Sequence, residues 1–224
     1  MQRRHSQSGT LNTPTPSPEE VKKYIEHWNK HPDYHHYRKQ EELIERLFNP
    51  ENPTPNIDPI LVLEKVCVLE TFYSTNLVRN NGLDALVRMV EFILDFKDFD
   101  DRLKEGYTSF IDEIVRRWKE QGGKNCLSFA TKYCFHHNRQ HFHIYDSKVV
   151  DALLHFKEGF GGERSDAQIK NHMKRSYTYY HICYEVFIGR YFEDDYAPDY
   201  GNQRCRYWCL DKYLWLLGKE KVIE

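Results

Sequence analysis

The sequence from Ile60 to Tyr73 reads ILVLEKVCVLETFY, a predominantly apolar run. It is longer than a usual β-strand of about five or six residues, and its apolar positions suit a mostly buried helix that ends near Ser74. Similar apolar spacing recurs over residues 83–96 and 109–119. No alternation of apolar and polar residues lasts long enough for a sheet. The sequence therefore predicts an all-α protein.

Helix signals lie on both sides of this run. Ser17 and Pro18, followed by two glutamates, mark a helix start with Ser17 as the N-cap. An extended link is expected from His141 to Tyr145. Further helices are predicted at 37–48, at 126–137, at 146–156, from Ser165 or Asp166, at 177–192 and at 204–217. We expect about ten helices, arranged in two lobes with a cleft between them.

The chain is expected to form one helical domain over residues 19–224, after a flexible leader over residues 1–18 that is rich in Ser, Thr and Pro. The predicted last helix carries an apolar stripe that requires a partner. Both ends of the chain are therefore expected in one lobe. The stripe consists of Tyr207, Leu210, Leu214 and Leu217.

The composition is typical of a soluble globular protein, with 40% hydrophobic and 29% charged residues. No apolar run approaches the roughly 18 residues of a membrane span, and no apolar signal segment follows Met1. We therefore expect neither a membrane protein nor a secreted one. Lys and Arg number 32 against 34 Asp and Glu, so no global basic signature of nucleic-acid binding is present.

The cysteines are scattered, with no Cys-x-x-Cys pair, which predicts free thiols in the reducing cytoplasm. The central region contains potential zinc ligands, namely Cys126, Cys134, His136, His137, His141 and His143. Their spacing matches none of the standard zinc-ligand patterns, so we expect no metal and no other cofactor.

The most informative stretch runs from Gly122 to Val150 and reads GGKNCLSFATKYCFHHNRQHFHIYDSKVV. It predicts a glycine turn, an apolar helix, a short extended link and then Asp146 at the start of the next helix. An aspartate in that position is a good N-cap, which is a purely structural role. On the spacing alone the capping role is favoured, because N-caps are common and catalytic carboxylates are rare.

Two segments of this stretch carry a family resemblance, namely 128–132 (SFATK) and 144–147 (IYDS). They resemble the helix-hairpin-helix DNA glycosylase superfamily, in its 8-oxoguanine-glycosylase-like branches. The resemblance implies that Asp146 is the catalytic carboxylate of an enzyme that flips a base out of double-stranded DNA and cleaves its N-glycosidic bond. It also implies a monomer at the nucleoid, acting in base-excision repair or against foreign DNA.

The resemblance implies two mechanisms. Bifunctional members use a nucleophilic lysine after the hairpin. In those members the lysine lies at a fixed range of sequence separation before the catalytic aspartate. In this sequence Lys132 lies closer to Asp146 than that separation, and Lys124 lies farther from it. We therefore expect a monofunctional hydrolase, with Lys132 as the alternative nucleophile. The expected substrate is an oxidised purine or a modified base, such as one in phage DNA.

Two further sets of residues are predicted to contact the substrate. A flipped base needs a pocket with aromatic and polar edges. Phosphates need backbone amides and cations. The candidate pocket residues are Phe72, Tyr73, Thr75, Asn76, His143 and Tyr145. The candidate DNA contacts are Gly122, Gly123, Lys124, Asn125, Arg116 and Arg117.

Two alternative functions remain open. Arg175 and His181 have the spacing of the Arg-x(4–6)-His motif in helical ribonucleases of the HEPN type. The shortened hairpin also fits a helical DNA-binding protein without catalytic activity.

Overall fold

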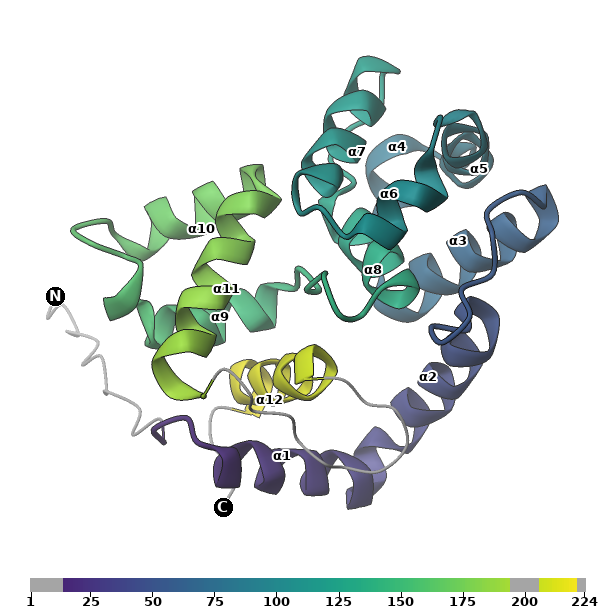
Figure 1. Ribbon diagram of the computed structural model, residues 1–224. Coiled ribbons are helices and arrows are strands. Elements are labelled where there is room, and N and C mark those ends of the chain that lie inside the picture. The colour runs from purple at the N-terminus through teal and green to yellow at the C-terminus, as the bar shows by residue number, and fades with distance from the viewer. Residues whose placement is uncertain (1–13, 194–205, 221–224) are drawn as a thin grey trace, which may run out of the picture.

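The computed structural model describes residues 14–193 and 206–220, and in these ranges it contains helices and no strands (Figure 1). The prediction of an all-α protein is confirmed. The α-helices are α1 (Pro18–Lys30), α2 (His35–Phe48), α3 (Pro59–Tyr73), α4 (Leu77–Asn81), α5 (Ala85–Asp95), α6 (Phe99–Glu105), α7 (Ser109–Glu120), α8 (Leu127–His137), α9 (Ser147–His155), α10 (Asp166–Arg175), α11 (Tyr177–Tyr191) and α12 (Arg206–Glu220). Two 3₁₀ turns lie at Pro32–Tyr34 and Lys157–Gly159.

The capping residues and the apolar spacing in the sequence predicted most of these helices correctly. The hydroxyl of Ser17 accepts a hydrogen bond from the amide of Glu20 at 3.2 Å, and Pro18 is the first helical residue, as predicted. Most of the expected leader, residues 1–13, lies outside the described residues. The predicted start of the last helix, at residue 204, lies outside them as well.

The structure adds two short helices that the sequence did not predict, α4 and α6. Each begins at a residue with a left-handed backbone, Asn76 (φ 61°) and Asp98 (φ 59°). These helices are too short to show a clear apolar period. The helix expected over 83–96 begins at Ala85, because Leu83 lies in the preceding turn with 90% of its surface exposed.

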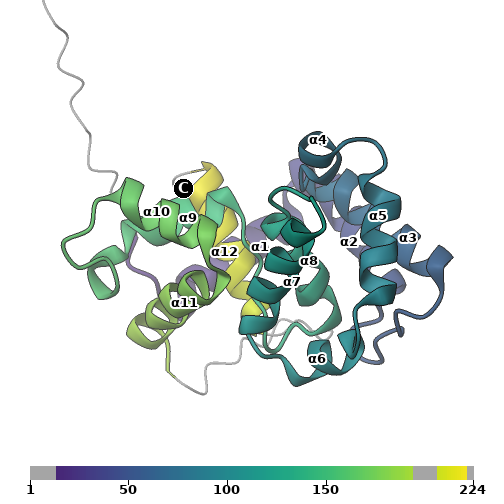
Figure 2. The same cartoon turned by 90° about the horizontal axis from the view of Figure 1, so that it is seen from above.

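The helices fall into two groups. Figures 1 and 2 both show α9 to α12 on one side of the molecule and α3 to α8 on the other. Within the first group, α12 packs on α9 and α1. The ring of Tyr24 in α1 meets Tyr213 in α12 at 5.0 Å, and Trp28 meets Trp215 at 5.9 Å. The first and last described helices therefore pack against each other.

The turn between α7 and α8 depends on its two glycines. Gly122 has a left-handed backbone with φ 81°, which favours glycine. A Cβ at Gly123 would overlap the indole of Trp118. These two glycines allow a close turn between α7 and α8, which pack against each other.

None of the helices in the described ranges combines the length and the apolar content that crossing a membrane requires. Four cysteines in these ranges are free thiols, in agreement with the prediction. They are Cys67, Cys126, Cys134 and Cys183.

The helices α12 and α9 approach each other closely at Gly218. A Cβ built there would overlap the backbone carbonyl of Lys148, in the first turn of α9. This contact lies two residues from Asp146, so any side chain at Gly218 would push α12 away from the start of α9.

A matched pair of variants tests this approach. Gly218 and Gly189 each stand third from the end of a long helix, α12 and α11, but a Cβ at Gly189 meets nothing. We expect Gly218→Ala to lower the free energy of unfolding by about 1–3 kcal/mol through overpacking. Gly189→Ala should raise it by about 0.5–1 kcal/mol, because alanine is the better helix former. Urea denaturation measures both, and equal effects would contradict the close contact.

Candidate functional site

A cavity of about 220 Å³ lies where the two groups of helices meet. Since one buried water needs roughly 10–15 Å³ on this scale, the cavity has room for roughly 15–22 water-sized atoms. Aromatic side chains line part of its wall, namely Trp28, Tyr37, Phe72, Tyr73 and Trp215. Its charged groups come from α2, α8, α12 and the N-cap of α9, and they are Glu41, Lys132, Asp146, Asp211 and Lys212.

Asp146 combines the two roles that the sequence left open. Its backbone is extended (φ −137°, ψ 144°), and its carboxylate caps α9 by accepting a hydrogen bond from the amide of Lys148 at 2.8 Å. The same half-buried residue lines the cavity. The start of α9 favours negative charge there through its free amides and dipole. Asp146 is therefore a capping residue that also presents a carboxylate to the cavity.

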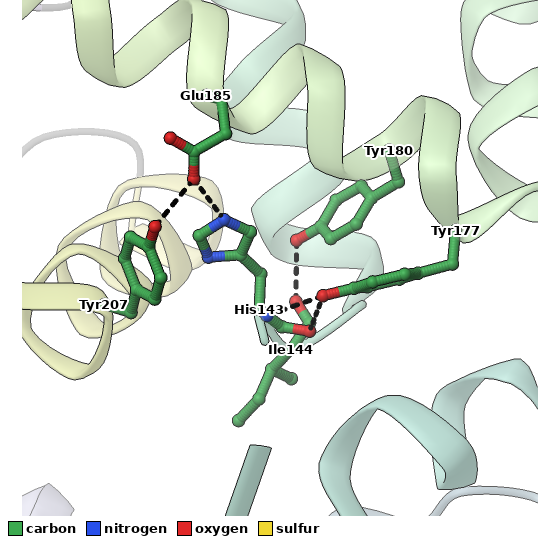
Figure 3. A network of polar contacts seen from close by, with 6 residues as sticks. All are labelled: His143, Ile144, Tyr177, Tyr180, Glu185 and Tyr207. Carbon is green, nitrogen blue, oxygen red and sulfur yellow. Dashed lines mark hydrogen bonds and ion pairs between the residues drawn. The ribbon is translucent and has the colours of Figure 1, made fainter. Parts of the chain in front are cut away.

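The link that leads into Asp146 is held by tyrosines of α11 (Figure 3). The hydroxyl of Tyr177 accepts a hydrogen bond from the amide of His143 at 2.7 Å and lies 3.3 Å from the carbonyl of the same residue. The hydroxyl of Tyr180 donates to the carbonyl of Ile144 at 2.6 Å. Because these groups are buried and have no neighbouring strand, side chains must satisfy them.

Two residues of α8 hold the other side of the link. The amide of Tyr145 donates to the hydroxyl of Thr131 at 3.1 Å, and the amine of Lys132 donates to the carbonyl of Tyr145 at 3.0 Å. Asp146 follows directly, so its position is fixed from both groups of helices.

Lys132 is 1% exposed and faces the cavity. Its amine also donates to the hydroxyl of Ser128 at 2.9 Å and lies 5.4 Å from the centre of the Tyr73 ring. Burial lowers the pKa of this amine, while the charges of Asp146 and Asp211 act to raise it. The structure thus brings Lys132 and Asp146 to one cavity, although the sequence spacing had argued against such a pair.

A charged trio that the sequence did not predict also lines the cavity. The ammonium of Lys212 lies 2.5 Å from the carboxylate of Glu41 and 4.0 Å from that of Asp211. Asp211 is 5% exposed, and burial raises the pKa of its carboxyl to about 7. Its Oδ1 atom has no hydrogen-bond partner among the described residues. The available signal was a pair of adjacent charges inside the apolar run 208–217.

Of the six predicted pocket residues, Phe72 and Tyr73 line the cavity. Thr75 does not, because it is buried and its hydroxyl donates to Glu70. Asn76 is exposed at the start of α4, where its amide donates to the carbonyl of Ser74 at 3.0 Å. The left-handed backbones of Ser74 and Asn76 turn the chain away from the cavity.

His143 and Tyr145 also lie outside the cavity wall. The His143 ring is buried on the other side of the link, with its Nε2 atom 2.8 Å from the carboxylate of Glu185. The Tyr145 ring packs edge-on against Tyr180 at 5.2 Å. Successive side chains of an extended link point to opposite sides, so residues adjacent to Asp146 do not share its surroundings.

The glycine turn differs from the predicted phosphate cradle, because its amides are already hydrogen-bonded. The amide of Gly122 donates to Lys119, that of Gly123 to Trp118 and that of Lys124 to Asn81. The side chain of Asn125 accepts from the amide of Leu127 at 3.1 Å. The exposed side chain of Lys124 therefore remains the group of this turn that is suited to a phosphate.

The two predicted arginines differ in their availability. Arg117 lies 2.5 Å from Glu113 and 4.2 Å from the centre of the Phe96 ring, so its guanidinium is engaged within the protein. Arg116 is exposed, pairs with Glu120 at 2.5 Å, and lines a surface groove together with Lys119 and Arg175. Arg116 is thus the better placed of the two for DNA.

The Arg175–His181 motif is divided between two helices. Arg175 is the last residue of α10, whereas His181 lies within α11 and stacks on His143 at 4.8 Å. An arginine and a histidine that serve one phosphodiester must converge on it. This arrangement does not favour the ribonuclease interpretation.

The buried carboxyl of Asp211 predicts a specific dependence of stability on pH. Its pKa is about 7 in the folded chain and 3.8 in a solvated one, so between these values the folded state binds the extra proton. Asp211 should therefore lower the free energy of unfolding as pH rises from about 4 to 7, by up to about 1.4 kcal/mol per pH unit. Asp211→Asn should remove this contribution. Denaturation of both proteins across this range measures it, and parallel curves would contradict the assignment.

Comparisons with known proteins place the chain in a family. The family model HI_0787_N, described as an N-terminal domain, matches residues 20–141. A relative from Haemophilus influenzae strain Rd, described as an uncharacterized protein, is 36% identical over 162 residues, which are 71% of this chain and 67% of the relative. No solved structure matches the chain. On the extent of the family match and of this identity, the chain belongs to the HI_0787_N family.

Proposed function

We propose that this protein is a DNA N-glycosylase, which takes a flipped damaged or modified base into the cavity and hydrolyses its bond to deoxyribose. The observation that carries the proposal is the placement of Asp146, a helix-capping carboxylate on the wall of an aromatic cavity. The same residue stands at the position where the glycosylase resemblance requires the catalytic carboxylate.

The cavity offers the contacts that a planar, polar-edged base needs. Aromatic rings such as Tyr37 and Trp215 provide stacking faces. Asp211 provides a buried carboxyl oxygen that lacks a partner, and a buried polar atom of this kind gains free energy when a ligand satisfies it. With a pKa of about 7, the carboxyl of Asp211 is able both to donate and to accept. These features support an oxidised purine or another base with a hydrogen-bonding edge as substrate.

The chemistry assigned to Asp146 is electrostatic. As the base leaves, positive charge develops on the deoxyribose, and a fixed carboxylate stabilises it. The same carboxylate orients the attacking water and accepts its proton. The link His143–Tyr145 holds Asp146 in place through bonds from α8 and α11. A carboxylate positioned before the reaction loses little free energy to reorganisation.

Lys132 provides the competing route. A buried amine with a lowered pKa, on the same cavity as Asp146, is able to attack the sugar carbon and form a Schiff base. In the hydrolytic route, by contrast, Lys132 remains hydrogen-bonded to Ser128 and Tyr145. We propose the hydrolytic route, in which Lys132 acts as a positioning residue for the link.

The remaining parts of the proposal concern the partner and the setting. The two groups of helices act as lobes with double-stranded DNA in the cleft between them, and Lys124 and Arg116 contact its phosphates. The protein works as a monomer in the cytoplasm, at the nucleoid. Repair of damaged bases and attack on modified foreign DNA use the same chemistry, and the released base distinguishes them.

Asp146→Asn tests the catalytic role directly. Asn caps a helix about as well as Asp, so the free energy of unfolding should change by less than about 0.5 kcal/mol. Loss of the charge should slow base release at least 100-fold, which corresponds to roughly 3 kcal/mol of transition-state stabilisation. Mass spectrometry of free bases released from a panel of modified duplexes measures the rate.

Asp58→Asn is the matched control, since Asp58 caps α3 by accepting a hydrogen bond from Ile60 at 2.9 Å and does not line the cavity. This control should keep full activity. If the Asp146→Asn variant released the base at the wild-type rate, the role of Asp146 would be limited to capping α9. A wild-type protein that releases no base from any duplex in the panel would overturn the glycosylase proposal.

Borohydride trapping separates the two mechanisms. In the hydrolytic route no Schiff base forms, so we expect wild-type protein incubated with substrate DNA and borohydride to give no covalent adduct on a denaturing gel. An adduct that disappears in Lys132→Gln would identify Lys132 as the nucleophile. The enzyme would then be a bifunctional lyase.

A further inference from the structure

A cluster of possible metal ligands lies on the side of the link that faces away from the cavity. One nitrogen each of His143 and His181 and a carboxylate oxygen of Glu185 all lie within 4.8 Å of one another. Figure 3 shows the Glu185 carboxylate directed at both His143 and the hydroxyl of Tyr207. The cluster takes no part in the proposed base chemistry.

Two elements build the cluster. His181 and Glu185 are four residues apart on α11 and therefore share one face of the helix. His143 comes from the buried link, with its Nε2 atom 2.8 Å from an oxygen of Glu185. In a tetrahedral zinc site, bonds of about 2.1 Å place two ligand atoms roughly 3.4 Å apart. To hold an ion, the His143–Glu185 contact opens slightly, and the longest ligand separation, up to 4.8 Å, shortens to about that value.

The hydrogen-bonding pattern around the cluster is incomplete. The Nδ1 atoms of His143 and His181 are both buried and have no partner among the described residues. Two imidazole rings beside a carboxylate make a donor set suited to zinc.

We propose that His143, His181 and Glu185 bind one divalent transition-metal ion of the zinc class, with water in the fourth position. When the ion takes the place of the proton between His143 and Glu185, that proton moves to the free Nδ1 atom of His143. The hydroxyl of Tyr207, 3.0 Å from Glu185, orients the carboxylate. The ion would tie His143 to α11 only three residues before Asp146, and so fix the link that carries it. This site does not depend on the glycosylase proposal.

Calorimetric titration tests the site directly. Full-length protein without an affinity tag is stripped with a chelator and titrated with Zn²⁺, and Co²⁺ is added in parallel to detect tetrahedral absorption bands. We expect one ion per chain with a Kd in the micromolar range or below. His181→Gln and Glu185→Gln should each weaken binding at least tenfold. Both side chains are partly exposed, so these variants keep the fully buried His143 itself unchanged.

The chain supplies a matched control on α1. His27 and His31 are also four residues apart, with rings 4.7 Å apart and Asp33 close to His31. The double variant His27→Gln, His31→Gln should bind the ion as wild type does. Circular dichroism and thermal unfolding without metal should show that all the variants are folded. Loss of binding only in the double variant, or equal binding in all variants, would overturn the proposal.

Discussion

The structure depends on a buried stretch of extended backbone in an otherwise helical protein. The link from His143 to Tyr145 has no neighbouring strand, so side chains must satisfy its amides and carbonyls. Tyr177, Tyr180, Thr131 and Lys132 provide these hydrogen bonds. Because the four residues come from α8 and α11, the link joins the two groups of helices. These contacts therefore fix the position of Asp146 at the start of α9.

Local signals in the sequence were enough to predict most of the fold. The Ser17–Pro18 start, the apolar run over 60–73 and the Asp146 cap each depend on residues within a few positions of one another. The short helix α4 was not predicted, because it follows the left-handed backbone of Asn76 and is too short to show an apolar period. The same turn directs Thr75 and Asn76 away from the cavity. Because this turn was not predicted, both residues were wrongly predicted to line the pocket.

The cavity was harder to predict, since its walls come from segments that meet only in the folded chain. Phe72, Tyr73 and Asp146 were identified from nearby motifs, whereas Asp211 and Trp28 carry no local signal of a shared cavity. The family match covers only part of the candidate site. It spans residues 20–141, so it includes Lys132 but ends before the link and Asp146. The candidate site therefore draws on residues inside and outside the matched region.

The edge-on contact between Trp28 and Trp215 has a consequence for the order of events during folding. These rings are contributed by the first and last described helices, so the cavity closes one of the longest loops in the protein. The loss of chain entropy on closing a loop grows with its length, and contacts of such high sequence separation slow folding. On the ribosome, α1 to α11 emerge before α12 does. A growing chain therefore already contains Asp146 but lacks the α12 wall of the cavity, which makes the cavity a late product of folding.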